Sequence, residues 1–113
     1  MLEDRFAQHD KIPGSKYVEV FEDYELRTWD QVVLADTIVN NQPVTMTLPP
    51  VAEAKGRFYA VTVYKADSTR PLTIKDNGDS MSWTDVIVEY PGAKYLFYSD
   101  SKSWHVMITS YQP

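Results

Sequence analysis

Residues 43–65 read PVTMTLPPVAEAKGRFYAVTVYK, and this stretch decides the fold. The segment 44–48 alternates apolar residues with threonine, and the segment 58–65 alternates again. A period of two places every second side chain on one face, as in a β-strand with one buried side. Pro49 and Pro50 end the first strand, because proline has no N–H to give to a β-ladder. We therefore predict two strands joined through a proline corner.

The rest of the chain repeats this theme of short strands and polar turns. Turn-forming groups stand at residues 40–42, 77–78, 91–92 and 100–102. The Asn-Gly pair at 77–78 predicts a two-residue hairpin turn, because both central residues of that turn adopt positive φ. Turn signals about every 8 to 12 residues are typical of all-β domains. The predicted fold is an all-β, antiparallel sandwich or barrel of about eight or nine short strands.

The first 16 residues, MLEDRFAQHDKIPGSK, follow neither the helical nor the strand period clearly. We predict an N-terminal arm over residues 1–16, extended or flexible, because isolated short helices are marginal in water. A short helix with Leu2 and Phe6 on one side is the alternative. Residues 17–113 are predicted to form a single β domain. An arm of this kind can lie on a neighbouring subunit.

Composition excludes several classes of function. The 113 residues contain no cysteine, which excludes disulfides, thiolate catalysis and cysteine-ligated zinc. The net charge of −5 argues against a nucleic-acid partner, because phosphate binding needs clustered Lys and Arg. No apolar run approaches the roughly 20 residues of a membrane helix, and the acidic N-terminus does not read as a secretory signal. We expect a protein made in a cytosol that uses neither membrane nor cofactor.

The order and spacing of the strands resemble a known group of proteins. The run ADTIVNNQPVTMTLPPVAEAKGRFYAVTVYKADSTRPLTIKDNGDS (35–80), followed by SWTDVIVEYPGAKYLFYSDSKSWHVM (82–107), resembles small β-structured domains of bacteriophage virion proteins. Such domains recur in tail fibres, head fibres and capsid decoration proteins. The resemblance implies an antiparallel β domain, commonly trimeric, that serves as a virion building part. It brings no set of catalytic residues to this sequence.

The polar residues of the chain offer little sign of catalysis. Asp76, Asn77 and Asp79 could supply oxygen ligands for calcium, but the ligand series of a calcium loop does not continue, and an ordinary turn explains them. Sixteen acidic residues make chance carboxylate pairs unavoidable, as between Asp85 and Glu89. His105 has no nucleophile motif nearby. We expect a protein that is not an enzyme and holds no metal.

Aromatic residues make up 13% of the chain, with eight Tyr and three Trp. In the segment AKYLFYS, alternation places Tyr95 and Phe97 on one face and Leu96 and Tyr98 on the other. The aromatic residues can serve as core, as a subunit interface or as a platform that stacks sugars. The predicted interface residues, drawn from the arm and the aromatic residues, are Phe6, Ile12, Pro13, Tyr17, Trp83, Tyr95, Tyr98 and Trp104.

These observations lead to an expected function. A chain of this size with its own Met1 and a 16-residue lead is more similar to a capsid decoration (cement) protein than to a fibre fragment. We expect a homotrimer made in the host cytoplasm that binds the major capsid protein on the virion surface and stabilises the head across capsomers. The alternative is a tail- or head-fibre module that binds a host surface glycan. A small hydrolase is a third and poorer hypothesis.

Overall fold

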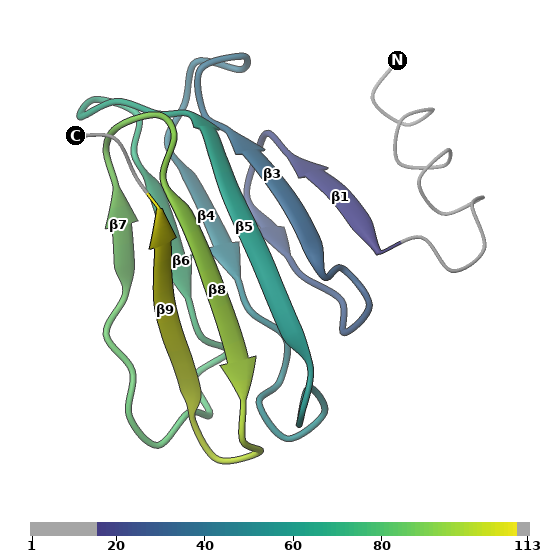
Figure 1. Ribbon diagram of the computed structural model, residues 1–113. Helices are drawn as coiled ribbons and strands as arrows, with labels where there is room; N and C mark the ends of the chain where they lie inside the picture. The colour runs from purple at the N-terminus through teal and green to yellow at the C-terminus, as the bar shows by residue number, and fades with distance from the viewer. Residues whose placement is uncertain (1–15, 111–113) are drawn as a thin grey trace.

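Nine β-strands build the protein in a computed structural model that describes residues 16–110, with side chains to residue 107 (Figure 1). The strands are β1 (Tyr17–Val20), β2 (Tyr24–Glu25), β3 (Val32–Asp36), β4 (Val44–Thr47), β5 (Phe58–Lys65), β6 (Leu72–Lys75), β7 (Val86–Val88), β8 (Lys94–Ser99) and β9 (Trp104–Ser110). Turns and loops join them, and the described residues contain no helix. The all-β prediction is confirmed. The predicted arm lies outside the described residues, apart from Lys16.

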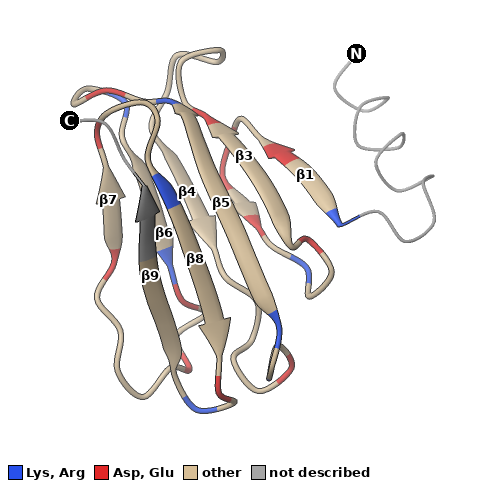
Figure 2. Cartoon of the chain, viewed as in Figure 1, with Lys and Arg blue, Asp and Glu red and all other residues tan. Residues whose placement is uncertain are grey.

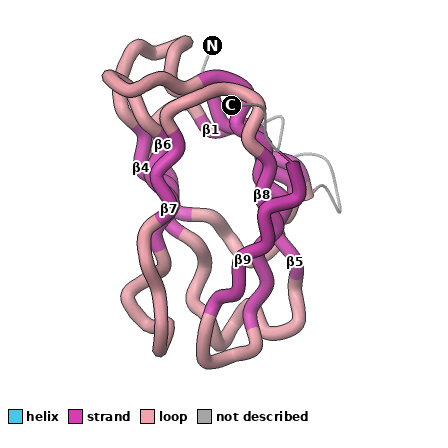
Figure 3. The backbone as a smooth tube through the Cα atoms, turned by 60° about the vertical axis from the view of Figure 1, so that its left-hand side comes forward, coloured by secondary structure: helices cyan, strands magenta, loops and turns pink. Residues whose placement is uncertain are grey.

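The strands form two sheets that lie opposite each other (Figure 3). The five-stranded sheet has the order β1-β3-β5-β8-β9, and the four-stranded sheet has the order β2-β4-β6-β7. From β1 to β6 the chain therefore passes from one sheet to the other after every strand. As a result β1, β3 and β5 are parallel, and so are β2, β4 and β6. The first six strands thus form three successive windings of the chain, each with one strand in the five-stranded sheet and one in the four-stranded sheet.

The prediction of a wholly antiparallel fold was therefore wrong in part. Antiparallel pairing is confined to β6 with β7, β5 with β8, and β8 with β9. A hairpin returns the chain within one sheet, whereas each connection in these windings crosses to the opposite layer, so successive strands of one sheet run the same way.

The predicted Asn-Gly hairpin was also wrong. Strands β6 and β7 are antiparallel neighbours, but residues 76–85 join them instead of a two-residue turn. Gly78 has a positive φ of 83°, whereas Asn77 is not among the residues with positive φ. A two-residue turn of the predicted kind needs positive φ at both positions. Asp79 in this connection instead accepts a hydrogen bond from the backbone N–H of Val51, 3.1 Å away, which ties the loop to the proline corner.

The core fills the space between the two sheets. Val44, Met46 and Leu48 point inward from the four-stranded side, as their alternation predicted. Tyr59 and Val61 on β5 point inward from the other sheet. Rows of paired residues continue this core across each sheet, as Val18, Val33, Val61 and Tyr95 show for the five-stranded sheet. Within residues 16–110 no helix is long and apolar enough to cross a membrane.

Candidate interaction surface

The outer side of the five-stranded sheet carries a row of apolar side chains across its full width. Strand pairing aligns Tyr17 with Val32, Val32 with Ala60, Ala60 with Leu96, and Leu96 with Met107. Tyr17, Val32 and Met107 are 42%, 49% and 43% exposed. On β1, β3, β5 and β8 this row alternates with the buried residues Val18, Val33, Val61 and Tyr95, so its side chains lie on the outer side of the sheet. The row therefore lies on the outer surface of the five-stranded sheet.

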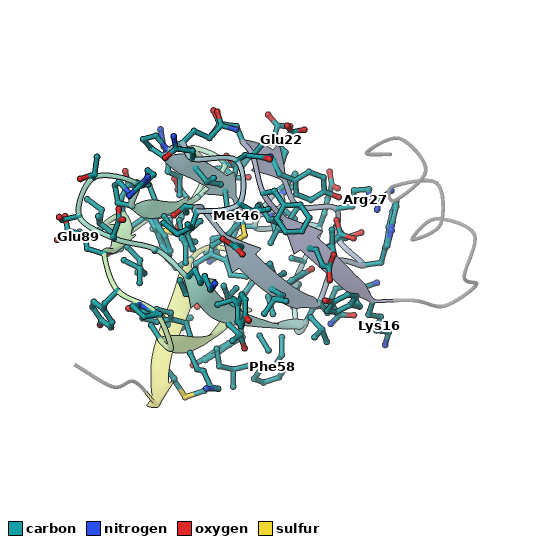
Figure 4. All side chains as sticks on the ribbon, turned by 90° about the horizontal axis from the view of Figure 1, so that it is seen from above. Lys16, Glu22, Arg27, Met46, Phe58 and Glu89 are labelled. Carbon is teal, nitrogen blue, oxygen red and sulfur yellow. The ribbon has the colours of Figure 1, made fainter. Side chains whose placement is uncertain are left out.

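A second row lies beside the first and is aromatic. The rings of Phe58 and Tyr98 are 5.5 Å apart, and the Tyr98 ring stacks on His105 at 4.8 Å. Phe58 lies at the periphery in the view from above, whereas Met46 lies between the two layers (Figure 4). The two rows together form what we call the apolar face, defined by Tyr17, Val32, Phe58, Ala60, Leu96, Tyr98 and Met107.

An ion pair borders the aromatic row. His105 Nε2 lies 2.8 Å from Asp100 Oδ2. Asp100 Oδ1 also accepts hydrogen bonds from the backbone N–H groups of Lys102 and Ser103, at 2.9 and 2.8 Å. The hydrogen bond from His105, and then these two backbone bonds, lower the pKa of Asp100 below its ordinary value. These hydrogen bonds stabilise the turn between β8 and β9, at the position where the sequence predicted a turn (residues 100–102).

Charged residues lie mainly away from the middle of this sheet. Figure 2 shows the middle of β3, β5 and β8 without charge, while acidic and basic residues mark the strand ends and loops. Glu19 on β1 and Lys94 on β8 are the charged members of the neighbouring row, in which Leu34 and Thr62 lie between them. An apolar centre with a charged rim is the usual composition of a protein–protein contact.

The outer side of the four-stranded sheet differs in chemistry. Strand pairing aligns Thr45 with Thr73 and Ile87, and aligns Thr47 with Lys75. Ile87 is exposed, at 58%, but its row is otherwise threonine. Threonine favours strands and also hydrogen-bonds to water, so this face suits solvent.

A buried carboxylate holds the corner where the chain passes from β2 to β3. Asp30 is fully buried, and its Oδ2 accepts hydrogen bonds from Tyr24 Oη and from the backbone N–H of Arg27, both at 2.8 Å. The Arg27 guanidinium completes the pair, with Nε 3.2 Å from the same oxygen. Burial, and then the Asp30 carboxylate, raise the pKa of Tyr24. These contacts use Asp30 to fix the corner, which explains its burial without a catalytic role.

Tyr59 ties the same corner to the central strand. Its hydroxyl donates to the backbone carbonyl of Thr28 at 2.7 Å, and burial raises the pKa of Tyr59 to about 12. Trp29 stands at this corner with 48% of its surface exposed, and the Arg27 guanidinium lies 5.0 Å from its ring centroid.

The structure separates the predicted interface residues into four groups. Tyr17 and Tyr98 belong to the apolar face. Tyr95 and Trp104 do not, because they are only 8% and 4% exposed and point into the core, so we remove them from the predicted contact set. Trp83 is half-buried, with its ring 6.1 Å from Phe97 and its Nε1 donating to Asp85 at 2.9 Å. The remaining three residues, Phe6, Ile12 and Pro13, lie outside the described residues.

Sequence reasoning missed five members of the apolar face, namely Val32, Phe58, Ala60, Leu96 and Met107. Their alternation with buried residues was readable, and it did place Leu96 opposite Tyr95. That these outward residues form one row depends on which strands are neighbours, and the parallel pairing of β1, β3 and β5 left no local signal.

The candidate calcium ligands have other partners. Asp76 Oδ2 accepts from the backbone N–H of Ser80 at 3.1 Å, and Asp79 Oδ2 accepts from that of Val51. In the part of the chain that the structure describes, His, Asp and Glu side chains do not gather in groups of three or more that could hold a metal ion. The carboxylates at this end of the molecule therefore shape turns.

Comparisons with protein-family models, with curated proteins and with solved structures found no match to this chain.

Proposed function

We propose that this chain is a structural protein of a bacteriophage virion, and that it decorates the capsid as a homotrimer bound to the major capsid protein. It acts by adding buried surface between neighbouring subunits, without chemistry. The observation that carries the proposal is the apolar face, which crosses all five strands of one sheet.

The physical basis is the free energy of burying apolar surface. Removing apolar area from water contributes about 25 cal/mol per Å2, so a face of this kind favours association once a complementary surface is present. Tyr, Phe and Met, which it contains, are enriched in the centres of protein interfaces. The resemblance of residues 35–107 to virion β domains supports the same conclusion from an independent direction.

A homotrimer suits a protein that must remain on a capsid. When one subunit is bound, the other two act at a high effective concentration, so modest contacts combine into firm attachment. The net charge of −5 keeps free copies soluble before assembly.

The alternative, a fibre module that binds a host glycan, has weaker support. It requires an exposed aromatic patch at a loop end, with Asn77 or Asp79 as polar partner. Trp104 is buried, Trp83 packs against the core, and Asp79 accepts the hydrogen bond from Val51. Trp29 is exposed, but Arg27 lies over its ring.

Quantitative mass spectrometry of purified virions, from the phage that encodes this chain, tests the proposal. We expect many copies per head, and heads lacking the gene should release DNA at a lower temperature. Finding the chain only in tail fractions that bind host glycans would support the alternative. Its absence from virions would overturn both.

A further inference from the structure

We propose that Asn77 is a site of spontaneous chemical modification, at which the asparagine side chain is converted to isoaspartate or aspartate. The attacking group is the backbone nitrogen of Gly78, and water is the only other reactant. This inference goes beyond the proposed function and does not rest on it. It gives a chemical role to the Asn-Gly pair, which does not form the hairpin turn that the sequence predicted.

The pair lies in the exposed part of the connection between β6 and β7. Asp76 Oδ2 accepts a hydrogen bond from the backbone N–H of Ser80 at 3.1 Å, which joins the two ends of this segment. Between these ends Asn77, Gly78 and Asp79 are exposed, whereas Asp76 and Ser80 are partly buried. Water therefore reaches the pair while both ends of the segment stay in place.

The two groups that must react have no competing partners. In the described part of the chain, neither the backbone N–H of Gly78 nor the side-chain amide of Asn77 makes a hydrogen bond. Gly78 has a φ of 83°, and apart from its chain neighbours no atom lies within 4 Å of the place that a Cβ would take. Because glycine has no side chain, nothing on the attacking residue hinders its approach to Cγ of Asn77.

The other two asparagines of the chain, Asn40 and Asn41, provide an internal contrast. The nitrogen that could attack Asn40 is that of Asn41, and its N–H donates to the Ile38 carbonyl at 3.0 Å. The corresponding N–H for Asn41 is that of Gln42, which donates to the Thr37 carbonyl at 3.2 Å. Both side-chain amides also have hydrogen-bond partners. We therefore expect modification at Asn77 and not at Asn40 or Asn41.

The reaction is an internal acyl transfer followed by hydrolysis. The Gly78 nitrogen forms a bond to Cγ of Asn77, the bond from Cγ to the side-chain nitrogen breaks, and ammonia leaves with the proton that the Gly78 N–H gives up. Water then opens the resulting succinimide ring. Cleavage at Cγ gives aspartate in an ordinary main chain, and cleavage at the main-chain carbonyl gives isoaspartate, in which the chain runs through Cβ and Cγ. One water is consumed and one ammonia is released, without oxidation or reduction.

The modification changes the charge and the length of this segment. Either product adds a carboxylate between Asp76 and Asp79, and like charges this close repel one another. Isoaspartate also adds one carbon to the main chain. Both changes act against the hydrogen bond from the Val51 N–H to Asp79, which ties the connection to the proline corner. We expect the Val51 amide to exchange with deuterated water faster in the modified protein than in fresh protein.

Incubation of the full, folded chain at about 37 °C and about pH 8, sampled over several weeks, tests the site. Trypsin separates Asn77, in the peptide 76–94, from Asn40 and Asn41, in the peptide 28–55. Mass spectrometry should show a gain of about 1 Da in the first peptide and none in the second. Because exposed loops open at little cost in free energy, the rate should lie within about tenfold of the rate for the same chain unfolded in guanidinium chloride.

Asn77→Gln is the matched control, because attack on the longer side chain requires a six-membered ring, which forms much more slowly. The position is exposed, so this variant should keep the circular dichroism of the wild type. Wild type should become more acidic on anion exchange as it ages, and Asn77→Gln should not.

Three outcomes would overturn the assignment of the site. The first is a rate in the folded protein more than about tenfold below that of the unfolded chain, which would show that the fold protects Asn77. The second is an equal gain of mass in the two peptides, and the third is an acidic shift that persists in Asn77→Gln. Unchanged exchange at Val51 after modification would overturn the predicted effect on the connection.

Discussion

The two outer sides of this protein meet the same structural demand with different residues. Both are surfaces of sheets built from parallel strands joined by an antiparallel one, and both need residues that favour extended backbone. The four-stranded sheet meets this demand with Thr45, Thr47 and Thr73, which also suit water. The five-stranded sheet places Val32 and Leu96 at comparable outward positions. Strand formation alone therefore does not account for the apolar residues, whereas the association that we propose does.

The largest expected effect is on the free energy of unfolding, and it comes from the β2–β3 corner that joins the two sheets. Asp30→Asn removes the buried charge that fixes the β2–β3 corner, leaving Arg27 and Tyr24 with a weaker acceptor. We expect a loss of about 2 kcal/mol in the free energy of unfolding, the usual scale for a damaged buried charged network. Urea unfolding at fixed protein concentration measures it.

The β5–β6 corner provides a matched control. Asp67 and Arg70 are also three residues apart in the chain and form an ion pair, with Oδ2 2.6 Å from Nη2, but the Asp67 side chain is 41% exposed. Asp67→Asn should therefore change the unfolding free energy little, because solvent screens the pair. Equal losses at both corners would contradict the role assigned to burial at Asp30.

Exchanging residue types between the outer sides of the two sheets tests directly whether the apolar residues serve association. Val32→Thr with Leu96→Thr gives the five-stranded sheet the chemistry of the other sheet, at a cost below about 1 kcal/mol in the stability of the subunit. Because apolar area is lost from the proposed contact, the self-association constant should fall by about tenfold or more. Analytical ultracentrifugation over a dilution series measures it.

The opposite exchange serves as the control. Thr45→Val with Thr73→Val makes the outer side of the four-stranded sheet apolar. Stability should change little, while solubility falls and a new, larger species forms. Unchanged association of the Val32→Thr, Leu96→Thr protein would argue that the apolar face stays in water.

Much of the fold could be predicted because its signals are local. The alternation of residues 44–48 and 58–65 identified the inward side of two strands, and the turns at 40–42, 91–92 and 100–102 separate the strands as expected. Parallel pairing could not be predicted in this way, since it depends on connections that cross between sheets. At residues 77–78 the local hairpin signal did not decide the structure: residues 76–85 form a longer connection, in which Asp79 accepts a hydrogen bond from Val51 in a distant part of the chain.

The candidate surface was predicted less well, for a related reason. Aromatic type indicates a large buried area but not whether that area is buried by the subunit or by a partner. Tyr95 and Tyr98 have the same side chain three positions apart, yet the first points into the core and the second outward. Only the position of the second sheet distinguishes them. The small and aliphatic members, Ala60 and Val32, carry no signal of their own until the register aligns them.

The smallest expected effect concerns the ion pair beside the aromatic row. Because its pKa is lowered in the folded protein, Asp100 binds a proton less readily there than in the unfolded chain. Its contribution to stability is therefore fully present above the ordinary carboxyl pKa of about 4 and is lost as the pH falls below that value. Asp100→Asn should lower the melting temperature slightly at pH 7. The difference between the two proteins should then shrink as the pH is lowered from about 4 to about 2.

Differential scanning calorimetry across this pH range measures that difference. His105→Phe keeps a ring against Tyr98 while removing the partner of the carboxylate, so it should reproduce part of the effect if the ion pair is its cause. A gap between wild type and Asp100→Asn that stays constant down to pH 2 would instead assign the role of Asp100 to the turn geometry alone. Since both side chains are nearly half exposed, salt should reduce the effect, which separates it from the apolar contact that salt does not weaken.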